Sequence, residues 1–144
     1  MNAPGINDRN AIIALVAALD AAASALDVDR FLDLFVDGPD FAFAFNGTIR
    51  STREEVRAFH QAGWSSLRAV AFRTTVGHVA FPVPGIATLC ATGRSERVLH
   101  GGERRSGTYA LMLVIVHTPA GWRVLQCHES TDAAPTDAIL EESA

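Results

Sequence analysis

Residues 86–131 read IATLCATGRSERVLHGGERRSGTYALMLVIVHTPAGWRVLQCHEST, and this stretch decides the fold. It has no helical period. Apolar and polar residues alternate instead, around turn signals at Gly101-Gly102 and Thr118-Pro119-Ala120-Gly121. Alternation with a period of two indicates half-buried strands, and glycine-containing breaks between such runs indicate hairpins. We therefore predict three consecutive antiparallel strands, at residues 86–100, 103–117 and 122–131.

Further strands and turns are predicted between residues 41 and 85, from the same alternation and turn signals. Residues 69–80 form a further predicted strand, which the sequence PVPG at 82–85 closes. Phe41, Phe43 and Phe45 alternate with alanines and are followed by Asn46-Gly47, a strong signal for a tight hairpin. Residues 48–50 would form the short return strand. The sheet is thus expected to hold six strands.

Three segments have helical spacing instead. Residues 6–26 and 28–36 carry apolar side chains three and four positions apart. Ser51-Thr52-Arg53-Glu54 is a capping box that would begin a helix over about residues 52–62. The predicted order is α-α-β-β-α-β-β-β-β. This is one α+β domain over residues 1–131, with an acidic, mobile tail at 132–144.

Composition limits the function. The chain has 144 residues, of which 49% are apolar and 19% charged, and its net charge is −4. An acidic globular domain is a poor partner for nucleic acid. All 12 basic residues are Arg, which excludes chemistry that needs a lysine amine. The sequence shows no metal-binding motif, leader or membrane span, so we expect no metal, no cofactor and a cytoplasmic protein.

The turns also predict the register of the long strands. If Gly101-Gly102 is a two-residue loop, Arg94 pairs with Tyr109. If residues 119–121 form a three-residue loop, Leu111 pairs with Glu129. One face of the sheet would then carry Cys90, Thr92, Arg94, Glu96, Tyr109, Leu111, Leu113, Leu125, Cys127 and Glu129.

The opposite face is also largely apolar. It would carry Leu89, Ala91, Ser95, Met112, Val114, Val116, Trp122, Val124, Gln126, His128 and Ser130. Helices can cover only one face of a sheet in so small a domain, and a large exposed apolar patch is rare on a monomer. We therefore expect a homodimer through the face that bears Val114, Val124, Gln126 and His128.

The chain resembles the nuclear-transport-factor-2-like superfamily, and within it the SnoaL-like group. The residues that carry the resemblance are 29–35 (DRFLDLF), 46–47 (NG), 51–56 (STREEV), 121–124 (GWRV) and 127–130 (CHES). The resemblance covers about residues 8–131. It implies a cone-shaped α+β fold, a curved mixed sheet wrapped around N-terminal helices, with a pocket between sheet and helices. It also implies dimerisation through the outer face of the sheet.

The resemblance does not transfer an activity. The position of the general-base Asp of ketosteroid isomerases is Phe45 here, and their helical Tyr is missing because Tyr109 is the only Tyr. Two pocket Arg positions of kinase hub domains fall on Leu113 and Glu129. Arg94-Ser95-Glu96 with Glu129 loosely resembles the charged set of limonene-epoxide hydrolases.

The candidate site lies on the face that carries Glu129. Its expected ligand-binding residues are Phe41, Phe43, Phe45, His60, Trp64, Thr92, Arg94, Tyr109, Leu111, Leu113, Cys127 and Glu129. Either Arg94 holds a ligand anion while Glu129 accepts or moves a proton, or Arg94 and Glu129 simply pair with each other. Tyr109 either donates a hydrogen bond to a ligand carbonyl or fills space. Core packing is the more common role for such Phe residues, and His128 is expected at the dimer interface rather than in the site. His60 is either exposed or caps the pocket.

Two classes of function follow. The first is a domain that binds a small, partly apolar ligand without chemistry of its own. The alternative is a cofactor-free acid–base enzyme, an isomerase, cyclase or epoxide hydrolase, that uses Arg94, Tyr109 and Glu129 as its catalytic residues. A closed core with no ligand would be a third, purely structural outcome.

Overall fold

The computed structural model describes residues 6–132, so residues 133–144 of the expected mobile tail lie outside the described residues. The elements follow the predicted order. They are α1 (Ile6–Ser24), α2 (Val28–Leu32), β1 (Ala42–Phe45), β2 (Thr48–Arg50), α3 (Arg53–Trp64), β3 (Leu67–Val83), β4 (Ile86–Leu99), β5 (Arg104–Thr118) and β6 (Gly121–Thr131).

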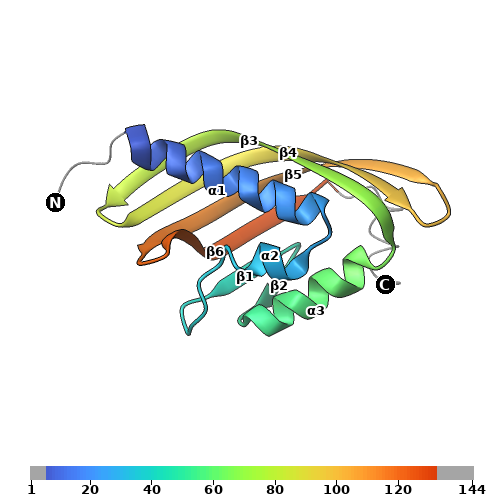
Figure 1. Cartoon of the computed structure of the whole chain (residues 1–144), viewed down its shortest axis with the longest axis horizontal. Helices are drawn as coiled ribbons and strands as arrows, with labels where there is room; N and C mark the ends of the chain where they lie inside the picture. Colours follow the sequence, from blue (N-terminus) through green and yellow to red (C-terminus); the bar gives the residue numbers. More distant parts are fainter. Residues whose placement is uncertain (1–5, 133–144) are drawn as a thin grey trace.

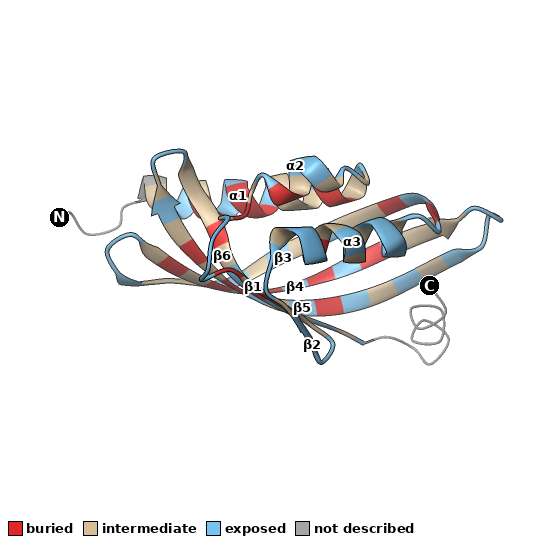
Figure 2. Ribbon diagram, turned by 90° about the horizontal axis from the view of Figure 1, so that it is seen from below, coloured by how far each residue is buried: buried red, intermediate tan, exposed pale blue. Residues whose placement is uncertain are grey.

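All six strands form one curved sheet in the order β2-β1-β6-β5-β4-β3. β1 is parallel to β6, and the other neighbours are antiparallel. Figure 1 shows α1 lying across the long strands, with α2 and α3 beside the short β1–β2 hairpin. The three helices cover the concave face only (Figure 2). The predicted α+β cone fold is therefore confirmed.

The core lies between α1 and the concave face of the sheet. Ile12 of α1, Leu89 of β4 and Ile115 of β5 are almost completely buried there. Full burial of such a side chain contributes about 1.5–3 kcal/mol each. The core occupies one end of the cone, and toward the other end the helices and the sheet separate.

The loop between β4 and β5 differs from the prediction. Leu99 N donates to Glu103 O at 2.8 Å and Gly102 N donates to Leu99 O at 2.8 Å, so His100, Gly101 and Gly102 form a three-residue loop. Gly102 has a φ of 89°, a left-handed conformation that glycine adopts without strain. The extra loop residue shifts the register by one, so that Gly93, not Arg94, pairs with Tyr109. The predicted β4 faces are therefore exchanged.

The loop between β5 and β6 differs as well, but a second irregularity compensates for it. Thr118 pairs with Gly121, so the loop has two residues instead of three. A register shift between Val114 and Ile115 then restores the predicted pairing of Leu111 with Glu129. Because of this shift, Val124 is fully buried in the core. Its predicted place on the outer, dimer-forming face is wrong.

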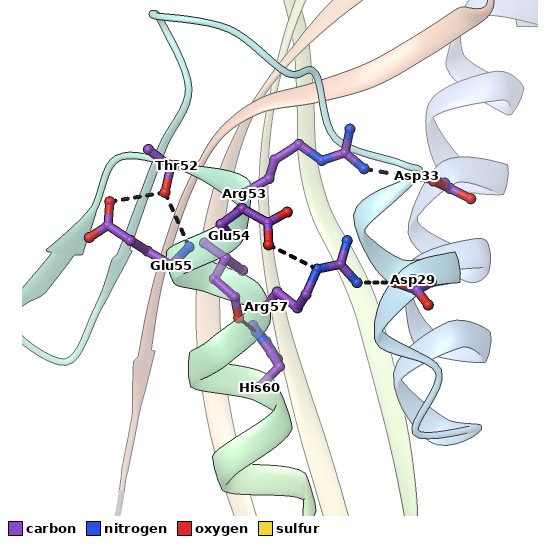
Figure 3. Close-up of polar contacts among 9 residues, drawn as sticks. Asp29, Asp33, Thr52, Arg53, Glu54, Glu55, Arg57 and His60 are labelled. Carbon is purple, nitrogen blue, oxygen red and sulfur yellow. Dashed lines mark hydrogen bonds and ion pairs between the residues drawn. The ribbon is translucent and has the colours of Figure 1, made fainter.

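Two helix ends also move. α2 ends at Leu32 instead of Val36, because the next residues pair with β6: Val36 N donates to Val124 O at 2.8 Å. α3 is capped by Thr52, not by Ser51. Thr52 Oγ1 accepts from Glu55 N at 3.1 Å, and the Glu55 carboxylate reaches back to Ser51 N at 3.4 Å. The capping box is real but one residue later than predicted (Figure 3).

None of the helices within residues 6–132 is long and apolar enough to cross a membrane.

Candidate functional site

A cavity of about 770 Å³ lies between the concave face of the sheet, α1 and α3. Of the twelve predicted ligand-binding residues, nine line it: Phe43, Phe45, His60, Trp64, Tyr109, Leu111, Leu113, Cys127 and Glu129. The space is large enough for a small organic molecule. Side chains therefore do not fill this space in the described part of the chain.

Three predicted site residues lie elsewhere. Thr92 and Arg94 are exposed on the outer face of β4, because the one-residue slip in the β4–β5 loop reverses this strand. Arg94 instead forms an exposed ion pair with Glu96, with 3.7 Å between the charged atoms. Phe41 is buried in the core against Phe35, with 6.0 Å between their ring centroids. The predicted convergence of Arg94 with Tyr109 and Glu129 is thus wrong.

One wall of the cavity is an aromatic cluster centred on His60 of α3. The His60 ring centroid lies 4.8 Å from that of Trp64 and 4.9 Å from that of Phe31. Phe59 and Phe43 complete the cluster at 5.1 and 5.5 Å. Edge-to-face and tilted contacts of this kind stabilise a rigid aromatic surface.

The protonation state of His60 follows from its surroundings. Its Nδ1 lies 2.9 Å from the carbonyl oxygen of Val56, which can only accept, so Nδ1 carries the proton. Burial, with a smaller contribution from the nearby Arg50, lowers the pKa of His60 to about 4. The ring is therefore neutral at pH 7, with an unprotonated Nε2. Figure 3 shows its position on α3. His60 is a cavity residue and not an exposed one.

The opposite wall contains a hydrogen-bonded chain that crosses the sheet. Tyr109 Oη lies 2.6 Å from Thr74 Oγ1 on β3. Thr74 Oγ1 in turn lies 2.6 Å from Asp20 Oδ1 on α1, and Thr74 N donates to Asp20 Oδ2 at 2.7 Å. Gly93 of β4 lies between Tyr109 and Thr74 in the sheet. Burial is the main reason that the pKa of Tyr109 is raised to about 12, so it is neutral at pH 7.

Arg50 was not predicted as a site residue. It lines the cavity, and its guanidinium carbon lies 3.9 Å from the centroid of the Phe59 ring. Its Nη1 is buried and has no hydrogen-bond partner among the described residues. Arg50 pairs with Phe43 across the β1–β2 hairpin. The alternation around Asn46-Gly47 was the signal that could have placed both side chains on one face.

Glu129 and Cys127 are neighbours on the cavity side of β6. Glu129 pairs with Leu111 on β5 and with Phe45 on β1, as a middle strand requires. Burial raises the pKa of the Cys127 thiol above its usual range, and the Glu129 charge raises it further. The thiol is therefore not activated as a nucleophile.

Charged residues that the sequence analysis did not select surround the mouth of the cavity, among them Arg97, Arg105 and Asp132. Arg105 forms an ion pair with Glu103 at 2.8 Å. The Asp132 carboxylate accepts a hydrogen bond from Thr108 N at 2.8 Å, which holds the pKa of this exposed carboxyl below its usual value. The part of the chain that the structure describes contains no cluster of His, Cys, Asp or Glu suited to a metal ion.

Ion pairs attach α3, the outer wall of the cavity, to α2. Arg57 bonds to Asp29, and Arg53 lies 3.7 Å from Asp33 (Figure 3). Both aspartates are largely exposed, and exposed pairs of this kind contribute little, about 0.2–1 kcal/mol each. The aromatic cluster around His60 is therefore the stronger attachment of this wall.

Comparison with known proteins identifies the fold. A search of curated proteins finds no match. A ketosteroid isomerase-like protein from Erwinia carotovora atroseptica has a TM-score of 0.76 at 12% identity, over 90% of this chain and 100% of that one. A nuclear transport factor 2-like superfamily protein from Salmonella enterica has a TM-score of 0.77 at 15% identity, over 90% and 94%.

A proposed dehydratase of the same family from Streptomyces avermitilis also has a TM-score of 0.77, at 18% identity over 89% and 98% of the two chains. At these identities the structures show a shared fold and no shared activity. The family model of the SnoaL-like domain matches residues 12–134, most of the chain. The protein therefore belongs to the SnoaL-like domain family and has the nuclear transport factor 2-like cone fold.

Proposed function

We propose that the protein binds a small, partly apolar ligand in the cavity between α3 and the concave face of the sheet. The observation that carries this proposal is the cavity itself, with its volume of about 770 Å³ and its aromatic wall. A space of this size lined by aromatic rings and a few convergent polar groups is typical of small-molecule sites. Arg50, Tyr109, His60 and Glu129 supply those polar groups.

The polar groups fit an uncharged or weakly polar ligand better than a strong anion. Arg50 lines the cavity with a buried Nη1, which would donate to a ligand oxygen. Glu129 and Asp20 bring negative charge to the same cavity. A ligand with one acceptor oxygen on an apolar body would satisfy Arg50 and cover the rings of Phe43 and Trp64.

Occupation of the cavity can be tested with a large side chain at Leu111, which faces it. Leu111→Trp should fill the space and abolish binding of a naphthalene-sized probe, measured by calorimetry. Met112→Trp is the matched control, because the neighbouring residue points to the outer face and is 55% exposed. Equal binding by the two variants would mean that the probe binds outside the cavity, which would overturn the proposal.

A second function, cofactor-free acid–base catalysis, is favoured by one arrangement. His60, with its unprotonated Nε2, and Glu129 line the same cavity, where proton transfer to or from a ligand carbon is possible. Two relatives in fold bear the descriptions ketosteroid isomerase-like protein and proposed dehydratase, which is compatible with a reaction of this type. Arg94, on the outer face, has no part in this proposal.

Proton abstraction next to a carbonyl can be measured directly. With 2-tetralone in D₂O, an enzyme of this kind would accelerate exchange of the C1 protons, followed by NMR. Glu129→Gln should remove that acceleration if Glu129 is the base, and His60→Gln if His60 is. Exchange at the buffer rate with the wild-type protein would contradict catalysis of this type and leave ligand binding as the function.

A further inference from the structure

Tyr109, Thr74 and Asp20 are joined by hydrogen bonds, and the number of hydroxyl protons determines which group donates in each bond. Thr74 Oγ1 has one hydrogen and lies 2.6 Å from each of its two partners. A carboxylate can only accept, so the Thr74 hydroxyl donates to Asp20 Oδ1. The other carboxylate oxygen is occupied by Thr74 N at 2.7 Å. Tyr109 must therefore donate its own hydroxyl proton to Thr74.

This direction determines what Tyr109 offers to a ligand. Its single proton is used by Thr74, so the oxygen can only accept from a group in the cavity. The raised pKa of Tyr109 keeps that proton in place at neutral pH. The expectation from the sequence that Tyr109 donates to a ligand carbonyl is thus reversed. His60 Nε2, which the bond from Nδ1 to Val56 leaves unprotonated, is a second acceptor in the same cavity.

We propose that the ligand presents a hydroxyl donor to Tyr109, and that Asp20, acting through Thr74, is the positioning residue that selects a hydroxylated compound over its ether. This inference rests on the proposed function, because it assumes that a ligand enters the cavity. The ligand class is a hydroxylated aromatic or alicyclic molecule. The surrounding rings, among them Phe45, Phe72 and Trp64, would contact its apolar body.

Two ligands with the same naphthalene ring can test whether Tyr109 accepts or donates a hydrogen bond in the cavity. 2-Naphthol can donate to Tyr109, whereas 2-methoxynaphthalene can only accept, and the cavity is large enough for both. We expect the wild-type protein to bind 2-naphthol about tenfold more tightly, because the ether oxygen would face the Tyr109 oxygen without a proton between them. A ratio of the two Kd values near one would overturn the inference.

Asp20→Asn provides a sharper test because it should reverse the direction of the hydrogen bonds between residue 20, Thr74 and Tyr109. The single amide oxygen of Asn would accept from Thr74 N, and its NH₂ group would donate to Thr74 Oγ1. The Thr74 hydroxyl would then donate to Tyr109, whose proton would point into the cavity. The preference for 2-naphthol should fall to about one or invert. An unchanged preference in a folded Asp20→Asn protein would contradict the role of Asp20.

Two further variants keep the test decisive if Asp20→Asn does not fold. Thr74→Val removes the relay and frees the Tyr109 proton, and Tyr109→Phe removes the acceptor itself. Both should reduce the ratio of the Kd values toward one while 2-methoxynaphthalene still binds. If the proposed function itself is wrong, the result differs: neither probe would bind, or Leu111→Trp would not block binding. Binding of both probes with a ratio that no variant changes would refute the inference alone.

Discussion

Tyr109 of β5 lies directly over Gly93 of β4, so that a Cβ atom at residue 93 would overlap the tyrosine ring. The absence of a side chain at this one position lets the ring cross β4 and reach Thr74 on β3. The same glycine therefore shapes the cavity floor and connects the Tyr109 hydroxyl to Asp20 on α1.

Gly93→Ala should displace Tyr109 and break its bond to Thr74. We expect a loss of about 1–3 kcal/mol in the free energy of unfolding, typical of overpacking in a filled core. Urea denaturation measures this loss. Gly107→Ala is the control, because the nearest atom to its added Cβ would be Ser95 Oγ at 3.6 Å, an ordinary contact. Equal stability of the two variants would show that Tyr109 repacks without cost.

Thr52→Ala should destabilise the protein by about 1 kcal/mol, because it removes the N-cap of α3. Ser51→Ala is expected to be nearly neutral, since Glu55 contacts only its backbone N–H. Chemical denaturation of both variants checks the position of the cap. A larger loss for Ser51→Ala would place the helix start one residue earlier, as the sequence alone predicted.

Because of His60, the free energy of unfolding should decrease at acid pH. Its pKa is about 4 in the folded protein against an ordinary value of 6.5 for histidine, so the unfolded chain takes up the proton first. Stability should be independent of His60 above pH 6.5 and fall as the pH drops from there toward 4, by up to about 3 kcal/mol. His60→Gln should lack this part of the acid slope. An NMR titration of His60 with a midpoint near 6.5 would contradict the assignment.

Arg94→Ala and Arg50→Ala should differ in their effect on ligand binding. Arg94 is exposed, pairs with Glu96 and interacts only weakly with the exposed Asp132, so its loss should change stability by less than about 0.5 kcal/mol and leave 2-naphthol binding unchanged. Arg50 lines the cavity with a buried Nη1, so its loss should weaken binding several-fold. Calorimetric titration of both variants decides the point. Loss of binding in Arg94→Ala would indicate that the ligand binds on the outer face of the sheet, where Arg94 lies.

We expect the protein to form a homodimer through the outer face of the sheet. Met112 is 55% exposed there, beside Val114, Gln126 and His128. Met112→Asp should shift the sedimentation coefficient from dimer to monomer. Ile13→Asp is the control, because Ile13 is 42% exposed on α1, which covers the other face of the sheet. A wild-type monomer at micromolar concentration would rule the dimer out.

The candidate site could be predicted in part, because the register shift between Val114 and Ile115 offsets the mispredicted β5–β6 loop, whereas no shift offsets the β4–β5 loop. The β1 aromatics Phe43 and Phe45 and the β6 residues Cys127 and Glu129 were placed correctly. Arg94 and Thr92 were not, because their placement depended on whether the Gly101-Gly102 loop has two or three residues. Asp20 and Thr74 could not be found at all, since 54 positions separate them along the chain.

The sequence by itself determined the order of the elements and the single-domain cone fold, because period-two alternation, Asn46-Gly47 and a capping box are local signals. Only the tertiary structure decided which face of β4 points inward. Gly-Gly is compatible with either loop length, so the choice depends on burial. The observed register places Leu89 and Ala91 under the helices and leaves Arg94 and Glu96 in water. The alternative register would bury both charges, and the cost of removing them from water outweighs any preference of the loop.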